Sequence, residues 1–186
     1  MIEAELKARL ADPDAVRAAL ARRATVERAT YRDTYYDTPG QDLDQAGREL
    51  RLRTVETADA VRHLLTFKEP VVDKASGSKP EHETTVGTPD AVDHLIQALG
   101  LRPLIALTKE CENYRLAVRG RDFLATVVRV PELDGMFLEV ETLAEERDVD
   151  EALAAVRQLL AELGVTADQL TTELYTDAVR AARSDG

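Results

Sequence analysis

The sequence predicts a single α+β domain in which about eight strands form a barrel-like or strongly curved antiparallel sheet, with helices packed outside it. Most of the chain alternates apolar and polar residues at every second position, which is typical of half-buried strands. Helical patterns are few, and they stand between or after the strands. No linker is long enough to divide the chain, so we expect one domain over residues 1–186.

Strand patterns fill the first half of the chain. In residues 2–10 the apolar side chains take one phase and the charged side chains take the other. Asp12-Pro13 then begins a short helix, because proline suits the first helical turn. Further strands are expected at residues 24–37, 48–57, 61–70 and 81–86, with a flexible loop at 73–80.

A helix and four more strand patterns follow. Residues 89–99 place Val92, Leu95, Ile96 and Leu99 on one side of a helix that Gly100 ends. Strands are expected near 103–111, 113–119, 122–130 and 136–143, which would bring the strands of the barrel to about residues 1–143. Gly120-Arg121 has the form of a two-residue hairpin turn with glycine first.

The C-terminal segment, about residues 148–183, is predicted to be helical. One apolar stripe runs through its first helix, which Gly164 ends, and consists of Val149, Leu153, Val156, Leu160 and Leu163. Asp148 and Glu151 have the spacing of a capping box at the start of that helix. A last helix is expected over about residues 167–183.

Composition narrows the possible partners. The net charge of −11 disfavours binding to nucleic acid or to an anionic membrane, so we expect neither partner. The single cysteine, Cys111, allows no intrachain disulfide and no cysteine zinc site. The chain begins with strand-like alternation and has no long apolar stretch, which predicts a cytoplasmic location.

Charged residues share one face of several predicted strands. The sets in phase are Glu3, Glu5, Lys7 and Arg9; Arg51 and Arg53; Arg62, Thr66 and Lys68; and Glu139 and Glu141. A solvated face explains any one of these strands. If the sheet closes, however, the faces converge inside, where uncompensated charge is costly. A polyanion bound with a divalent metal ion would offset this cost, because Arg and Lys bind phosphate oxygens and carboxylates bind Mg²⁺ or Mn²⁺.

These segments resemble the CYTH superfamily, the triphosphate tunnel metalloenzymes, which include class IV adenylate cyclases and thiamine triphosphatases. The resemblance rests on six stretches in the order and spacing of the family: "EAELK" (3–7), "YYDTP" (35–39), "LRLR" (50–53), "LTFKEP" (65–70), "EHE" (81–83) and "FLEVE" (137–141). It implies an eight-stranded antiparallel closed β-barrel, a tunnel that binds a triphosphate-containing small molecule together with Mg²⁺ or Mn²⁺. A homodimer is an open alternative to a monomer.

The resemblance also assigns roles to individual residues. Glu5 and Lys7 would be catalytic. Glu3, Glu5, Glu139 and Glu141 would ligate metal. The residues that would hold phosphate oxygens are Lys7, Arg51, Arg53, Lys68, Lys79, Lys109 and Arg115.

Two departures from the family pattern leave the number of metal ions and the rate of turnover open. Where the family often has Lys-x-Arg, this chain has Lys109-Glu110-Cys111, and Arg115 on the same strand face is a candidate substitute for the arginine. An aspartate that often precedes "FLEVE" in the family falls here on Val128 or Arg129.

Other chemistry-bearing residues have simpler explanations. The histidines (His63, His82 and His94) have no metal-ligand spacing, and we expect them on the surface or in outer packing. Cys111 has no neighbouring histidine to activate it, so it is interpreted as a small buried residue. The tyrosines Tyr31, Tyr35 and Tyr36 are expected to pack in the strand rather than to stack on a base.

Three functions remain. The first is a metal-dependent triphosphatase that acts on tripolyphosphate, a nucleoside triphosphate or thiamine triphosphate. The second is a class IV-type adenylate cyclase that converts ATP to cyclic AMP and pyrophosphate. The third is a non-catalytic sensor of polyphosphate or nucleotide, which the two departures favour. No adenine-reading group can be located in the sequence, so hydrolysis is the first choice.

Overall fold

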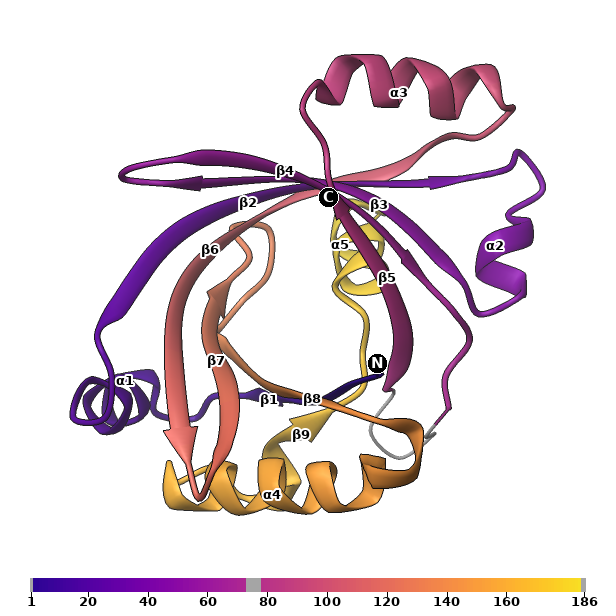
Figure 1. Ribbon diagram of the computed structural model, residues 1–186. Coiled ribbons are helices and arrows are strands. Elements are labelled where there is room, and N and C mark those ends of the chain that lie inside the picture. Colours follow the sequence, from indigo (N-terminus) through magenta and orange to yellow (C-terminus); the bar gives the residue numbers. More distant parts are fainter. Residues whose placement is uncertain (1, 73–77, 185–186) are drawn as a thin grey trace.

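The strands of this protein form one closed antiparallel barrel. We describe residues 2–72 and 78–184 of a computed structural model. The strand order is β5-β4-β3-β2-β6-β7-β8-β1-β9, and β5 also pairs with β1, so that β1 to β8 close on themselves. Figure 1 looks along the barrel, with the strands arranged as a ring. The predicted eight-stranded barrel is therefore confirmed.

The strand bounds agree with most of the predicted ranges. They are β1 (Ile2–Arg9), β2 (Val26–Asp37), β3 (Glu49–Thr57), β4 (Val61–Lys68), β5 (Lys79–Thr85), β6 (Arg102–Val118), β7 (Arg121–Arg129), β8 (Phe137–Ala144) and β9 (Leu170–Thr171). Of the loop expected at 73–80, residues 73–77 lie outside the described part of the chain.

The main hydrophobic core lies outside the barrel wall. The helices are α1 (Pro13–Ala21), α2 (Asp42–Gln45), α3 (Pro89–Ala98), α4 (Val149–Glu162) and α5 (Tyr175–Ser184). The apolar phase of β1, represented by Leu6, packs with Leu153 and Val156 of α4 in one buried cluster. Figure 1 shows α4 lying along the outer side of β1 and β8. Because the apolar phase faces outward, the charged phase of β1 faces the inside of the barrel.

The predicted break within residues 103–119 and the predicted position of the hairpin turn after them were both wrong. Residues 103–111 and 113–119 form one strand, β6, which is 17 residues long and spans the barrel wall. The turn after it consists of Arg119 and Gly120, with φ of +52° and +76°, because Val118 already pairs with Arg121. Positive φ at both positions is the type I′ geometry that suits the twist of a hairpin.

The C-terminal segment also differs from the prediction. Instead of a helix from about residue 167, a 3₁₀ turn (Ala167–Gln169) leads into β9, and α5 begins only at Tyr175. Asp148 occupies the N-cap position of α4, but its side chain makes no capping hydrogen bond. The capping box lies instead at Thr166 and Gln169 of the 3₁₀ turn.

Helix α3 is attached to the barrel by a narrow contact. Of its predicted apolar stripe, Ile96 is buried, whereas Leu95 and Leu99 are 59% and 80% exposed. A hydrogen bond of 2.7 Å from the Tyr36 hydroxyl to Asp93 joins the helix to β2. Across residues 2–72 and 78–184, no helix combines the length and apolar character needed to cross a membrane.

Candidate functional site

The charged strand faces converge on one cavity inside the barrel, of about 330 Å³. Every site residue predicted from the sequence lines this cavity: Glu3, Glu5, Lys7, Arg51, Arg53, Lys68, Lys79, Lys109, Arg115, Glu139 and Glu141. The strands bring them together because each side chain occupies the inward phase of its strand. Their roles as ligands of metal or phosphate remain predictions.

Three carboxylates form a tight group at one side of the cavity. Glu3, Glu5 and Glu141 each offer an oxygen within 4.8 Å of the oxygens of the other two. Glu5 and Glu141 stand directly opposite each other where β1 pairs with β8. Oxygen donors at this spacing suit a hard divalent cation such as Mg²⁺ or Mn²⁺.

Burial and the crowding of like charges raise the pKa values of Glu5 and Glu141. Burial, followed by the negative charge of Glu139, raises the pKa of Glu5 to about 7. Burial and the charges of Glu3 and Glu5 raise the pKa of Glu141 well above its usual range. Without a cation, the group therefore holds protons that exposed carboxylates would release.

Glu139 stands in a different environment from the other three acids. Its carboxylate lies 3.5 Å from the ammonium group of Lys109. Burial alone would raise the pKa of Glu139, but Lys109 and Lys7 outweigh it and hold the pKa below its usual value. Glu139 is therefore an ionised partner of the two lysines. It does not belong to the group of Glu3, Glu5 and Glu141, so its role as a metal ligand stays a prediction.

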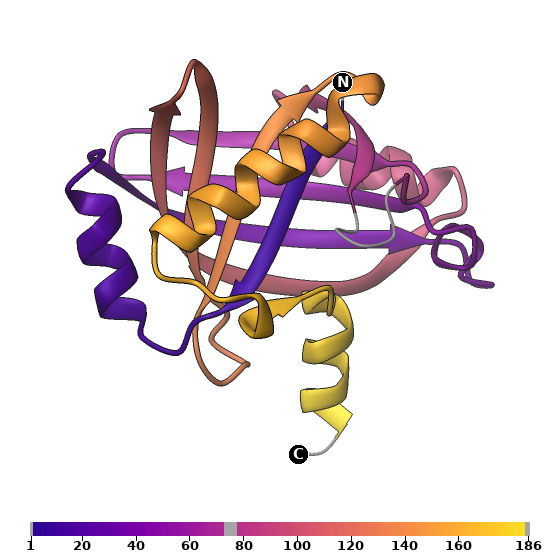
Figure 2. The same ribbon diagram turned by 90° about the horizontal axis from the view of Figure 1, so that it is seen from below.

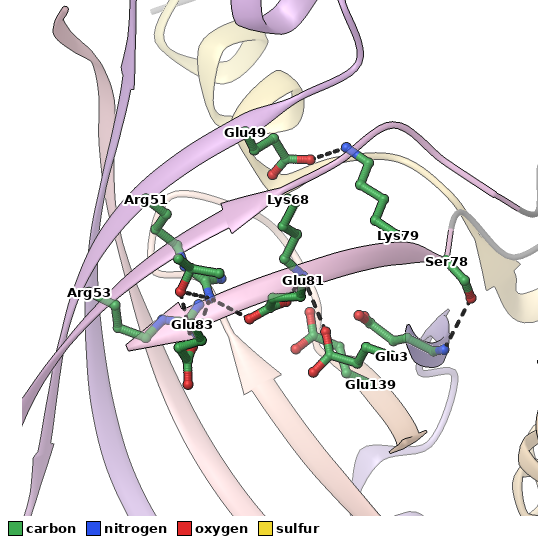
Figure 3. A network of polar contacts seen from close by, with 12 residues as sticks. Glu3, Glu49, Arg51, Arg53, Lys68, Ser78, Lys79, Glu81, Glu83 and Glu139 are labelled. Atoms are coloured by element: carbon green, nitrogen blue, oxygen red, sulfur yellow. Dashed lines mark hydrogen bonds and ion pairs between the residues drawn. The ribbon is translucent and has the colours of Figure 1, made fainter. Parts of the chain in front are cut away.

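Several cavity cations are held by acids from other strands of the barrel (Figure 3). The ammonium group of Lys68 lies 3.2 Å from Glu3 and 2.8 Å from Glu81. Lys79 pairs with Glu49. The guanidinium of Arg51 lies 3.9 Å from Glu81 and donates to the Thr66 hydroxyl over 3.3 Å. An entering polyanion would find these cations already oriented toward the inside of the barrel.

Asp33 is a structural partner of the site that the sequence analysis missed. Arg53 donates two hydrogen bonds of 2.6 Å to its two carboxylate oxygens. Burial would raise the pKa of Asp33, but Arg53 outweighs it and lowers that pKa to about 2. Only the pairing of β2 with β3, which sets Asp33 opposite Arg53, identifies this pair.

The structure shows where the two departures from the family pattern lie, at Cys111 in β6 and at Val128 or Arg129 in β7. Cys111 is buried, which confirms its interpretation as a small buried residue, and burial raises the pKa of its thiol to about 12. Val128 is buried in phase with Thr126, which lines the cavity, whereas Arg129 is exposed and bonds Glu110. The β7 position nearest to the family aspartate therefore presents a hydrocarbon side chain.

Two cavity arginines remain without ion-pair partners in the described part of the chain. Arg62 and Arg115 line the cavity and are exposed. No carboxylate of residues 2–72 or 78–184 lies within 4.0 Å of either guanidinium. Arg115 shares the inward face of β6 with Lys109, as the sequence suggested for a substitute arginine.

Aromatic residues contribute more to the cavity than the sequence predicted. Tyr31 and Tyr35 line it, and the guanidinium of Arg53 lies 4.6 Å from the centre of the Tyr31 ring. Tyr31 and Tyr35 also pack against one buried cluster and Tyr36 lies in another, so the expectation of strand packing holds for all three. Tyr175, which had no predicted role, also lines the cavity from the start of α5. None of the histidines is among its described lining residues.

Comparison with known proteins identifies the family of this chain. The family model of the CYTH domain matches residues 1–175. The chain belongs to the CYTH family. Its similarity to the adenylate cyclase CyaB of Aeromonas hydrophila is 27% identity over 183 residues, which cover 93% of this chain and 86% of that protein.

Solved structures share the CYTH fold with this chain. The protein PH1819 of Pyrococcus horikoshii is 24% identical, with a TM-score of 0.82 over 96% of this chain and 98% of that chain. A Hippeastrum protein, HpAC1, is 18% identical, with a TM-score of 0.68 over 97% of this chain and 96% of that chain. HpAC1 is described as a candidate adenylyl cyclase with a dominant triphosphatase activity.

The raised pKa of Glu5 predicts how the stability of this CYTH protein depends on pH. Glutamate has an ordinary pKa of 4.5, and Glu5 has about 7 in the folded protein. Between these values the folded state binds the additional proton, so the free energy of unfolding of the metal-free protein should fall as the pH rises from about 5 to about 8, by about 2 kcal/mol.

Urea unfolding in EDTA and in excess Mg²⁺ measures this effect. A cation bound by the carboxylates should remove most of the fall, because it stabilises their ionised form. The variant Glu5→Gln should flatten the pH dependence in EDTA. An equal fall with pH in EDTA and in Mg²⁺ would show that the carboxylate group binds no cation.

Proposed function

We propose that this CYTH protein is a triphosphatase that hydrolyses a triphosphate-containing substrate in the presence of Mg²⁺ or Mn²⁺. The observation that carries the proposal is the meeting of two kinds of groups in one cavity. Three carboxylates within 4.8 Å of one another lie beside a set of inward-facing lysines and arginines. A divalent cation on the carboxylates and a polyanion on the lysines and arginines would each offset the repulsion of like charges there.

The carboxylates Glu3, Glu5 and Glu141 would hold the cation, and Glu139 would keep Lys109 and Lys7 in place. A divalent cation bound there supplies positive charge that offsets the negative charge of the phosphate oxygens. The remaining phosphate oxygens would be bound by Arg51, Arg53, Lys68 and Lys109. Arginine suits this role because its planar donors match two phosphate oxygens at once.

Hydrolysis then needs one water molecule and one proton acceptor. Water attacks the terminal phosphorus atom, a new P–O bond forms, and the bridging P–O bond breaks. Glu5 takes the proton that the attacking water loses, because a cation held beside it would keep its carboxylate ionised and able to accept a proton. The cations stabilise the charge that spreads over the phosphate oxygens in the transition state. Tripolyphosphate yields orthophosphate and pyrophosphate.

The relatives support two reactions. The triphosphatase activity in the description of HpAC1 supports hydrolysis. The name of the Aeromonas hydrophila relative supports a class IV-type cyclase, in which the ribose 3′-hydroxyl attacks the α-phosphate. One feature of the cavity also favours the cyclase: Val55, Leu64 and Leu124 line it beside Tyr31, which offers an apolar surface to a base.

Incubation with tripolyphosphate or ATP and Mg²⁺, followed by separation of the products, decides between these reactions. The triphosphatase should release orthophosphate from tripolyphosphate and form little or no cyclic AMP from ATP. Cyclic AMP and pyrophosphate from ATP, with tripolyphosphate left intact, would establish the cyclase. Binding of both compounds without turnover would establish a sensor.

A further inference from the structure

Tyr175 reaches the cavity from the C-terminal segment, which Figure 2 shows at one end of the barrel. Its side chain is 7% exposed and lines the same cavity as the charged residues of the barrel strands. The Tyr175 ring packs edge-on against Phe137 of β8, with ring centres 5.2 Å apart. The residue is thus fixed against the barrel wall on one side and faces the cavity on the other.

The Tyr175 ring holds two of the predicted phosphate-binding lysines. The ammonium groups of Lys7 and Lys109 lie 4.3 Å and 4.2 Å from the ring centre. These distances are those of cation–π contacts, which favour a defined position for each ammonium group. An anion that both lysines bind would therefore lie near Tyr175.

The hydroxyl group of Tyr175 has one neighbouring acceptor, the Glu139 carboxylate. Its oxygen is buried and makes no hydrogen bond of ordinary geometry within the described chain, although the Glu139 carboxylate is nearby. Glu139 is already paired with Lys109. Buried hydroxyl groups are nearly always hydrogen-bonded, so an oxygen of a ligand in the cavity is a suitable acceptor for this donor.

The C-terminal segment is anchored well enough to present this hydroxyl to a ligand. β9 pairs with β1, where Thr171 stands opposite Lys7. The carbonyl of Glu173 accepts a hydrogen bond from the Lys7 ammonium group. At the far end of α5, Arg183 donates to Glu132 over 2.6 Å and to the carbonyl of Ala106 over 2.8 Å.

We propose that Tyr175 is a substrate-contacting residue whose hydroxyl donates a hydrogen bond to an oxygen of the bound polyphosphate, while its ring sets the positions of Lys7 and Lys109. This inference rests on the proposed function, because it takes a triphosphate as the ligand of the cavity. Phosphate oxygens accept hydrogen bonds, which matches the one donor that this side chain offers. Burial, followed by the charge of Glu139, raises the pKa of Tyr175 well above its usual range, so the hydroxyl keeps its proton.

The test compares the binding of imidotriphosphate, a tripolyphosphate analogue with nitrogen in the bridging positions, to several variants by calorimetry in excess Mg²⁺. Tyr175→Phe keeps the ring and removes the hydroxyl, and it should weaken binding about tenfold or more. The melting temperature without ligand should not fall. Tyr175→Leu also removes the cation–π contacts and should weaken binding further. Tyr36→Phe is the matched control, because its hydroxyl bonds Asp93 away from the cavity, and it should bind like the wild type.

A second background separates direct contact from an effect through Glu139. In Glu139→Gln protein, the added variant Tyr175→Phe should still weaken binding about tenfold. Loss of that penalty would overturn the inference, since the hydroxyl would then act by orienting Glu139. Equal affinities of the wild type and Tyr175→Phe would also overturn it while leaving the proposed function intact. Absence of binding by the wild type itself would overturn both proposals.

Discussion

Replacing Glu141 by glutamine should lower Mg²⁺-dependent release of orthophosphate from tripolyphosphate about a thousandfold, because an amide is a poor ligand for a hard cation. Glu141 belongs to the carboxylate group with Glu3 and Glu5. The loss of one ligand would weaken the cation that offsets the phosphate charge, and this charge stabilisation contributes several kcal/mol to such reactions. Glu5→Gln should have an effect at least as large, because it also removes the proposed proton acceptor.

The fold should survive the Glu141 substitution. Burial and neighbouring acids raise the pKa of this carboxyl, so a neutral amide relieves repulsion in the metal-free protein. The melting temperature of Glu141→Gln in EDTA should therefore equal or exceed that of the wild type. Glu146→Gln, an exposed position between β8 and α4, serves as the matched control and should retain full activity. A near-normal rate for Glu141→Gln at saturating Mg²⁺ would remove Glu141 from the metal site.

Replacing Arg53 by alanine should lower the free energy of unfolding by about 3–5 kcal/mol, because the substitution leaves the buried carboxylate of Asp33 without its partner. The Asp33 side chain has 0% exposure and receives two hydrogen bonds from Arg53. Urea unfolding near neutral pH measures the loss. Adding Asp33→Asn should recover much of it, since no isolated charge remains buried.

Arg157→Ala is the control for this prediction. Arg157 is exposed on α4 and has no ion pair to a carboxylate of residues 2–72 or 78–184, so its loss should cost less than about 0.5 kcal/mol. If Arg53→Ala were no more destabilising than Arg157→Ala, the Arg53–Asp33 pair would contribute little to the barrel. If the double variant were as unstable as Arg53→Ala, the isolated charge of Asp33 would not be the cause.

The sequence predicted the barrel and its charged interior because both depend on a strand period of two. The in-phase charges of Glu3, Glu5 and Lys7 face inward for the same reason that Ala4 and Leu6 are buried outside. A local pattern was enough for these residues. It predicted a last helix but neither its start at Tyr175 nor β9, because β9 forms by pairing with β1, which lies at the other end of the chain.

The parts of the site that escaped prediction all depend on neighbours far apart in the chain. Asp33 carries no signal of its own until β2 and β3 are paired. Tyr175 lies against Lys7 and Lys109, which are more distant still in the sequence. The different environments of Glu139 and Glu141 likewise depend on which cation each carboxylate meets across the barrel.

The most direct test of the metal and triphosphate site is a crystal of the protein grown with Mn²⁺ and imidotriphosphate, measured for the anomalous scattering of manganese. We predict an anomalous peak in contact with the carboxylates of Glu3, Glu5 and Glu141, and phosphate density beside Arg51, Arg53, Lys68 and Lys109. A manganese peak elsewhere, or a cavity that holds neither manganese nor phosphate at saturating concentrations, would contradict the proposed site.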